Sequence, residues 1–388
     1  MESRIDDPQA HMHSSGTHEP YDAYAVIRAL AQPRMTGSAG ADAVESELRS
    51  RFEALGYAIR DLPFNFSMTA GRFALTKIAA VYTVGVLGAT LLVANQLPAG
   101  AIVVLAGSLA LMLLYISYMR KNGIAQLPWG RSEGNNLWVQ REGAHPRYIL
   151  MAHRDSKSQI LPLSLRGPAI LLGILAWIAL LMLAILSLAR FVGMVPVVLV
   201  GIVAFVCGFA LAVSWADDRS PGALDNASGL AALLGVAARE KNAADVAFLI
   251  TDAEELGLAG ARAIAPRMPP VFGVINVDSI DDVGTFLIAE RFGWPRPSGL
   301  APNLAAALLG SAAELGLPAH RRDVPFGILL DHMPIVKGGT PALTLMRGTL
   351  GSLHRIHRPS DDLSHLRGTG VVQCVDLLCG ALALLRKA

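Results

Sequence analysis

The stretch Val246–Glu255 reads VAFLITDAEE, six residues of strand character followed by four residues of which three are acidic. Short apolar runs rich in β-branched and aromatic residues are typical of strands buried inside a parallel sheet. Sites in open α/β sheets lie beyond the carboxyl ends of such strands. The stretch therefore predicts a buried strand that leads into a group of acids, Asp252, Glu254 and Glu255, at the edge where a site would form.

Two further apolar segments end in the same way. Tyr148–Ala152 is followed by His153 and Asp155, and Val274–Val277 is followed by Asp278. One such ending is weak evidence, because isolated surface acids and buried histidines are common. Three endings that would meet along one edge of a sheet predict a shared functional site.

The spacing within these groups suits metal chemistry. His153 and Asp155 are two residues apart, so in an extended segment they share a face, and the carboxylate can orient a metal-bound imidazole. Glu254 and Glu255 are adjacent and should point in different directions. One of them can bind a metal while the other takes a proton from a nearby water as a general base.

Strand and helix patterns alternate around these segments, which predicts an α/β domain with a mixed central sheet and helices on both faces. The predicted strands are 136–140, 147–152, 246–251, 271–277 and 342–346. The predicted helices are 21–31, 41–55, 228–239, 259–265, 304–315 and 370–385.

Two long apolar blocks interrupt this domain. Residues 73–118 are broken only near Asn95–Pro98 and residues 168–215 only near Arg190–Pro196, so each half can form a helix of about 20 residues that crosses a bilayer. The chain is 53% hydrophobic and only 16% charged, against about 25% charged in soluble domains. Four buried core helices are the alternative, but a protein of this size has too little interior for them. We therefore expect four transmembrane helices in two hairpins.

This interpretation divides the chain into five parts. Residues 1–72, 119–167 and 216–388 form a split domain, and residues 73–118 and 168–215 form the hairpins. Because each block returns to its starting side, the whole domain lies on one side of the membrane. Basic residues accumulate near cytoplasmic span ends, which predicts an integral, multi-pass protein with a cytoplasmic domain. The domain-side basic residues are Arg72, Lys77, Arg120, Lys121, Arg131, Lys157, Arg166 and Arg219, whereas the tips carry only Arg190.

Six short segments become specific when they are taken together and in order. They are Ala152–Ser156 (AHRDS), Ser220–Gly229 (SPGALDNASG), Thr251–Leu258 (TDAEELGL), Asn276–Asp278 (NVD), Asp331–His332 (DH) and His357–Asp361 (HRPSD), with Pro33–Ser38 (PRMTGS) upstream. Together they resemble the co-catalytic di-zinc aminopeptidase family, whose relatives include glutamate carboxypeptidase II, the transferrin receptor and glutaminyl cyclase. The resemblance covers nearly all of the domain and neither hairpin.

The resemblance implies a site for two zinc ions. Asp225 would bridge both ions, His153 and Asp278 would complete one zinc site, and Glu255 and His357 would complete the other. Nitrogen and oxygen ligands without thiolate suit catalytic zinc, and such a site could also accept Mn²⁺ or Co²⁺.

The resemblance also implies roles around the ligands. Glu254 would be the general base for a water that bridges the metals, and Asp155 would orient His153. Asp361 would support the loop that carries His357, and His332 would contact the reacting carbonyl. The implied activity is that of a metallopeptidase of the aminopeptidase type, which hydrolyses the N-terminal peptide bond.

Other functions stay open at this stage. A glutaminyl cyclase or an N-acyl amidohydrolase would use a related site, and a non-catalytic receptor or scaffold is a third class. The substrate would be a peptide or an N-acylated small molecule, the lipid bilayer is a partner, and the net charge of +2 is too small to suggest a nucleic-acid surface. The hairpins either anchor the domain or place the membrane at one wall of the cleft, because the second one enters between His153 and Asp225.

Overall fold

A computed structural model describes residues 21–122, 127–241, 243–293, 297–325 and 328–387. The first 20 residues of the predicted 1–72 part and the side chains of Arg120 and Lys121 therefore lie outside the described structure.

The domain is built on a mixed sheet of eight strands in the order β1-β2-β4-β3-β5-β8-β6-β7. Strands β4, β3, β5 and β8 run parallel to one another, whereas β1–β2, β2–β4 and β6–β8 pair antiparallel. The strands are β1 (Ala58–Ser67), β2 (Arg131–Gln140), β3 (Tyr148–His153), β4 (Val246–Thr251), β5 (Gly273–Ile280), β6 (Thr285–Ala289), β7 (Ala319–Arg322) and β8 (Ala342–Gly348).

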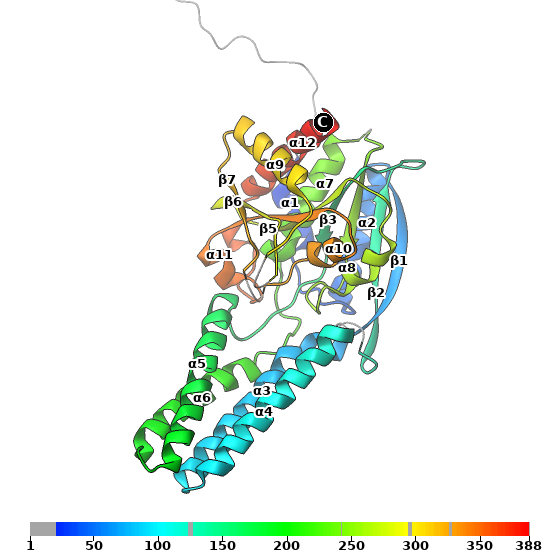
Figure 1. The fold of residues 1–388 in the computed structure, drawn as a ribbon. Helices are drawn as coiled ribbons and strands as arrows, with labels where there is room; N and C mark the ends of the chain where they lie inside the picture. The colour runs from blue at the N-terminus through cyan, green and yellow to red at the C-terminus, as the bar shows by residue number, and fades with distance from the viewer. Residues whose placement is uncertain (1–20, 123–126, 242, 294–296, 326–327, 388) are drawn as a thin grey trace, which may run out of the picture.

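Helices cover both faces of this sheet (Figure 1). Side chains alternate along β3, so Leu150 and Ala152 join one hydrophobic core while Ile149 and Met151 join a second core on the opposite face. The first face carries α1 (Ala23–Leu30), α2 (Ala39–Ala54), α7 (Gly229–Arg239), α9 (Pro302–Glu314) and α12 (Thr369–Lys387), and the second carries α8 (Ala259–Ile264) and α10 (His332–Lys337). The predicted α/β fold with a mixed central sheet is confirmed.

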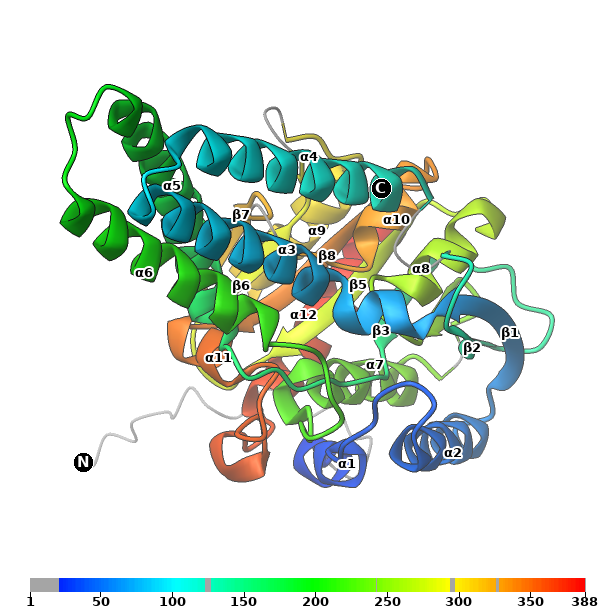
Figure 2. The ribbon, with the colours of Figure 1, turned by 90° about the horizontal axis from the view of Figure 1, so that it is seen from below.

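Four long helices project from the domain as one helical bundle (Figures 1 and 2). They are α3 (Met68–Ala94), α4 (Pro98–Asn122), α5 (Leu163–Leu188) and α6 (Met194–Ala212). Small residues let these helices approach closely; for example, Gly201 of α6 faces Thr90 of α3. The interior of the bundle is formed by Val86, Ala89, Ala101, Leu105, Ala176, Leu180, Ala184, Val197 and Ala204.

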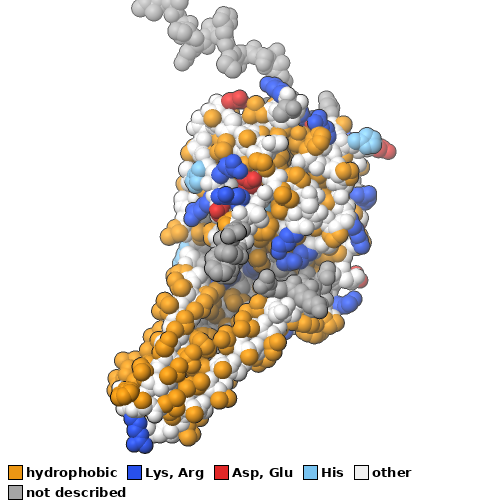
Figure 3. All heavy atoms as spheres, viewed as in Figure 1, with side chains coloured by type: hydrophobic (Ala, Val, Ile, Leu, Met, Phe, Trp, Pro, Cys, Tyr) orange, Lys and Arg blue, Asp and Glu red, His pale blue; other side chains and the backbone are white. Residues whose placement is uncertain are grey.

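The outside of the bundle is also apolar. Hydrophobic side chains cover its visible face, and basic charge lies at its far end (Figure 3), where Arg190 is the basic residue of the tips. Val84 and Val103 are each 71% exposed. Within the described residues, five helices are long and apolar enough to cross a membrane, namely the four bundle helices and α12. Helix α12 packs into the core of the domain. The outer apolar surface of the bundle, in contrast, is not covered by any other described residues.

Both hairpins leave and re-enter the domain at paired residues. Ser67 at the end of β1 pairs with Arg131 at the start of β2, so α3 and α4 are inserted at the closed end of an antiparallel strand pair. Ser158 and Asp217 form an isolated β-bridge that brackets α5 and α6 in the same way. Each insertion therefore begins and ends at one point, which leaves the surrounding sheet undisturbed.

The element boundaries differ from the predicted ones at the start of the first and third bundle helices. Helix α3 begins at Met68, because the Ser67 side chain accepts a hydrogen bond from the Ala70 N–H and caps it five residues earlier than expected. Helix α5 begins at Leu163, so Pro168 lies inside the helix and not at its start. Strands β1, β6 and β7 and helices α10 and α11 (Leu350–Arg355) were not expected.

The bundle rests directly on a loop that carries acidic residues. A Cβ atom on Gly71 of α3 would lie 2.3 Å from the carbonyl oxygen of Leu256, which directly follows Glu255. Only glycine allows this approach. The first hairpin is thus packed against the segment that ends strand β4.

We predict that Gly71→Ala destabilises the protein by about 1–3 kcal/mol, because the added methyl group overpacks this contact. The measurement is chemical unfolding of the purified protein. Gly107→Ala in α4 is the matched control, since a Cβ there meets no described atom within 4 Å. Equal stability of the two variants would contradict the close contact.

Candidate metal centre

The three strand endings predicted from the sequence lie side by side, because β4, β3 and β5 are adjacent parallel strands. They bring His153, Glu255 and Asp278 to one edge of the sheet. Two connecting segments reach the same place: the kinked turn η2 (Ala223–Ser228) supplies Asp225, and the loop after α11 supplies His357.

These five side chains form two groups that share Asp225. In the first group, His153 Nε2 lies 3.0 Å from Asp225 Oδ1 and 3.9 Å from Asp278 Oδ1. In the second, His357 Nε2 lies 3.1 Å from Asp225 Oδ2 and 3.0 Å from Glu255 Oε2. Within each group the ligand atoms lie within 4.8 Å of one another, so each group could hold a metal ion.

Burial and the neighbouring charges shift the pKa values of the clustered side chains. Burial opposes the charged forms of His153, Asp225, Glu255 and His357, yet the nearby carboxylates of Asp155, Asp225 and Asp278 raise the pKa of His153 well above its ordinary value. Burial likewise opposes ionisation of Asp225, but hydrogen bonds from His153 and His357 hold its pKa below the usual range. Positive charge is therefore required at the two points where the imidazoles meet Asp225.

A layer of acids behind the cluster holds its backbone. The Asp155 carboxylate accepts the N–H groups of Glu254 and Glu255 at 3.0 and 3.1 Å. The ring of His153 is oriented by the Asp155 carbonyl oxygen, 3.1 Å from Nδ1, while the carboxylate lies at 3.6 Å. Asp155 thus contacts His153 most closely through its carbonyl oxygen, while its carboxylate holds the backbone of Glu254 and Glu255.

Asp361 holds the turn that carries the shared ligand. Its carboxylate accepts hydrogen bonds from the N–H groups of Leu224 and Asp225, at 2.8 and 3.1 Å. Its own N–H donates to the carbonyl oxygen of Arg358, next to His357. Burial and the nearby charge of Asp225 raise the pKa of Asp361 to about 7. The side chain therefore links the Asp225 turn to the His357 loop.

Glu254 is buried beside the cluster and belongs to neither metal group. Its side chain lines a cleft of about 140 Å³, here called the metal cleft, together with Asp225, Glu255, Asp278 and His357. Burial, reinforced by the charges of Glu255, Asp331 and Asp278, raises the pKa of Glu254 well above its ordinary value. A carboxylate with such a raised pKa readily accepts a proton.

His332 lies away from this group. Its Nδ1 is 2.7 Å from Thr344 Oγ1, and its ring packs edge-on against Phe292. It is fully buried and is not among the residues that line the metal cleft. Burial lowers the pKa of His332 to about 3. The geometry therefore does not show the predicted contact with a reacting carbonyl.

Three basic residues acquire positions that the sequence did not reveal. Lys157 Nζ lies 2.7 Å from Glu255 Oε2, and Arg166 of α5 lines the metal cleft. Both had been counted only as charges that flank a membrane span. Arg34 is fully buried and donates to the backbone carbonyls of Arg154 and Gly222 at 2.7 and 2.9 Å. The segment Pro33–Ser38 resembles the family, but the sequence alone does not show that Arg34 connects the end of β3 to the Asp225 turn.

Comparison with known proteins identifies the class. The profile of peptidase family M28 matches residues 136–382. The chain therefore belongs to this family of peptidases. A search of curated protein sequences finds no match.

Several solved structures share the fold. A glutaminyl cyclase from Porphyromonas gingivalis matches with a TM-score of 0.55 at 16% identity, over 94% of this chain and 97% of that one. A zinc aminopeptidase from Bacillus subtilis has a TM-score of 0.55 at 13% identity over 94% and 95% of the two chains. A leucine aminopeptidase precursor from Bacteroides thetaiotaomicron has a TM-score of 0.54 at 14% identity over 93% and 94%. Family and fold together support a metallopeptidase.

We predict that buried His332 makes the protein sensitive to acid. The unfolded chain binds a proton at this histidine below about pH 6.5, whereas the folded chain does so only near pH 3. Stability is therefore lost as the pH falls through 6.5, by about 2 kcal/mol at pH 5 for this group. Unfolding with chelator present, measured at pH 7.5 and pH 5, should show a smaller pH effect in His332→Asn than in wild type. Exposed His145 provides the control, because His145→Asn should leave the pH effect unchanged.

Proposed function

We propose that this M28 peptidase is a membrane-embedded, two-zinc metallopeptidase that hydrolyses an amide bond with Glu254 as the general base. The observation that carries this proposal is the pair of ligand groups that share Asp225. His153 and Asp278 would complete one zinc site, and Glu255 and His357 the other. The buried nitrogen and oxygen donors fit zinc, and one carboxylate oxygen of the second group, Glu255 Oε1, has no hydrogen-bond partner among the described residues.

Glu254 and its neighbours perform the proton transfers in this proposal. Bound zinc would supply Lewis acidity, polarising the amide carbonyl and making water a better nucleophile. Glu254 takes the proton from the attacking water and later donates it to the departing amine. Asp155 holds the backbone N–H groups of Glu254 and Glu255, so it positions the base relative to the ligands.

Two substrate types fit this chemistry. The aminopeptidase type follows from the similarity to aminopeptidases of this fold. N-acyl amidohydrolysis is favoured by one feature of the metal cleft. The four carboxylates among its described lining residues all belong to the ligand set or to the base, which leaves none to bind a free α-amine; they are Asp225, Glu254, Glu255 and Asp278.

The helical bundle supports the membrane part of the proposal. Its helices are long and apolar enough to cross a bilayer, and they expose large apolar side chains along their length. We propose that the domain lies on the cytoplasmic side, as the basic residues near the span ends predict. Fewer basic residues support this orientation, because Lys157 and Arg166 line the metal cleft and so have a role besides flanking a span.

We predict that Glu254→Gln lowers kcat by about 10²–10⁴-fold, because the amide side chain cannot accept the proton. The same variant should retain its metal, since Glu254 is not in either ligand group. Hydrolysis of an aminoacyl and N-acyl substrate panel and metal content by mass spectrometry give the two readouts. Glu314→Gln on the exposed end of α9 is the control. Equal activity of Glu254→Gln and wild type would contradict the mechanism.

We predict two metal ions per chain in wild type. His153→Ala and His357→Ala should each retain about one, and Asp225→Ala should retain neither, because only Asp225 belongs to both groups. Metal content of the purified variants tests this directly. A single ion that depends equally on both histidines would rule out the two-ion site.

We predict that the protein stays in the membrane pellet after carbonate extraction. A membrane-impermeant thiol reagent applied to intact cells should label Leu97→Cys at the bundle tip, and it should label Glu142→Cys in the domain only after lysis. Both positions are exposed, so accessibility of the side chain does not differ between them. Labelling in the opposite sense would reverse the orientation, and extraction by carbonate would contradict membrane embedding.

A further inference from the structure

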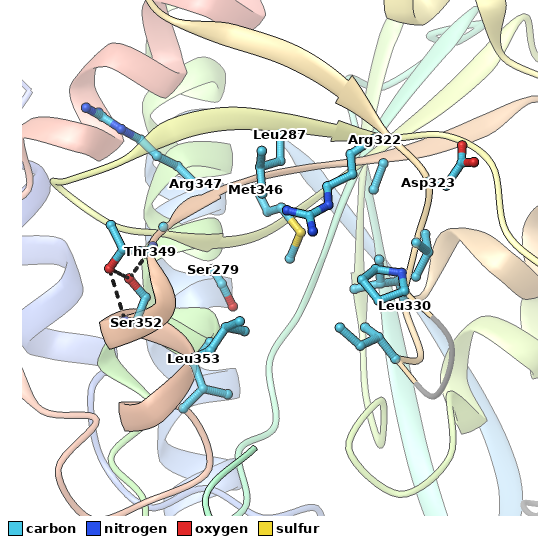
Figure 4. Close-up of a pocket in the computed structure, with 16 residues that line it drawn as sticks. Ser279, Leu287, Arg322, Asp323, Leu330, Met346, Arg347, Thr349, Ser352 and Leu353 are labelled. Carbon is cyan, nitrogen blue, oxygen red and sulfur yellow. Dashed lines mark hydrogen bonds between the residues drawn. The ribbon is translucent and has the colours of Figure 1, made fainter. Parts of the chain in front are cut away.

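A second cavity adjoins the metal cleft. It has a volume of about 120 Å³ and lies between β6, β8 and α11 (Figure 4). Side chains such as Leu287, Met346 and Leu353 point into it, so we call it the apolar cavity. The two spaces share several lining residues and therefore adjoin, and we call them together the groove. The shared residues are Ser279, Ile328, Leu330, Met346, Leu353 and Ile356.

The metal cleft contains two basic side chains that the apolar cavity lacks. Lys157 contacts Glu255, and its side chain is only 13% exposed. Arg166 donates a hydrogen bond to the side-chain oxygen of Gln159. The backbone N–H of Gln159 in turn donates to the carbonyl oxygen of His357 at 2.7 Å. The Arg166 Nε group is buried and has no partner among the described residues. Both residues thus place cationic groups beside the metal ligands, with donor capacity to spare.

With two zinc ions bound, Lys157 and Arg166 would set the net charge of the metal cleft. The metal cleft is lined by four carboxylates, and two divalent ions would neutralise them. Lys157 and Arg166 would then leave the cleft with net positive charge. Guanidinium and ammonium groups bind carboxylates through charge-assisted hydrogen bonds. A cleft of this charge favours an anionic substrate and disfavours one that presents a free ammonium group.

The acid in the wall of the apolar cavity does not change this balance. Asp323 is paired with Arg291, whose Nε lies 2.7 Å from Asp323 Oδ1. Arg322 also reaches the cavity (Figure 4). Among the described lining residues, every carboxylate is therefore committed to the metal site, to the base or to an arginine.

We propose that the groove takes amides that combine an apolar acyl part with a free carboxylate on the amine side, the chemistry of N-acyl amino acids. This inference rests on the proposed hydrolase function and names its substrate class. The acyl part occupies the apolar cavity, and Lys157 and Arg166 hold the carboxylate. The C–N bond breaks and a C–O bond forms with water; the products are an apolar carboxylic acid, as its anion, and an amino acid, whose amine gains the proton.

The position of Arg166 adds a specificity role for the second hairpin. Leu163 and Arg166 belong to the first turns of α5, and both line the metal cleft. Helix α11 carries Leu353 of the shared wall and packs against α5, where Ser164 Oγ lies 3.0 Å from His354 Nδ1. The hairpin therefore contributes side chains to the groove, beyond anchoring the domain.

The test compares matched pairs of substrates on the zinc-loaded, full-length protein. The first pair is N-octanoyl-alanine and N-octanoyl-alaninamide; the second is Leu-Ala and Leu-alaninamide. We expect kcat/KM to favour the free acid at least tenfold in the N-octanoyl pair. Faster cleavage of Leu-Ala than of N-octanoyl-alanine would contradict the preference for an acyl part without a free ammonium group. Arg166→Gln and Lys157→Gln should each reduce the acid-to-amide ratio at least threefold, while Arg166→Lys should largely keep it.

Acid and amide are compared on the same preparation of each variant. A smaller amount of folded protein lowers both rates equally, so the acid-to-amide ratio is unaffected. Arg219→Gln is the control, because Arg219 is a basic residue outside the groove that pairs with Asp217, and it should keep the wild-type ratio. Equal cleavage of acid and amide by wild type, or an unchanged ratio in both Gln variants, would overturn this inference alone. A wild-type protein that cleaves no member of either pair or of the wider panel would overturn the proposed function as well.

Discussion

The buried carboxylate of Asp225 is the constraint on which the site depends. It lies between the imidazoles of His153 and His357, and a buried charge costs several kcal/mol unless it is compensated. Compensation requires both histidines to be close, which fixes the end of β3 and the loop after α11 relative to the η2 turn. Asp361 holds that turn through its N–H groups. Cationic charge at this one carboxylate therefore organises segments that are distant in sequence.

The insertion of two helical hairpins into such a site has a simple geometric basis. A strand pair closes the first insertion at Ser67 and Arg131, and a bridge closes the second at Ser158 and Asp217. The chain ends that each insertion must join are already held together, so the added length costs little entropy. The sheet can therefore keep its register although a bundle of four long helices projects from the domain (Figure 2).

Much of this arrangement follows from the sequence, and what does not has physical reasons. Strand β4 matches its apolar run residue for residue, because burial on both faces gives a continuous hydrophobic signal. Strand β1 at the sheet edge contains Pro63 and is exposed or half-buried over most of its length, and β7 is mostly exposed, so neither carries that signal. The ligand residues could be named from local motifs, whereas the positions of Lys157 and Arg166 depend on how α5 packs.

The start of α5 in the wall of the metal cleft has a consequence for how reaction rates would scale. With the bundle in a bilayer, an amphiphilic substrate would reach the groove by lateral diffusion in one leaflet, beside the start of α5, where Leu163 lines the metal cleft. The relevant concentration is then the mole fraction of substrate among the lipids and not its amount per volume of water. Turnover would fall when inert lipid is added, even though the amounts of enzyme and substrate stay the same. The membrane would act as the reaction solvent, and membrane area would take the place of solution volume in setting the substrate concentration.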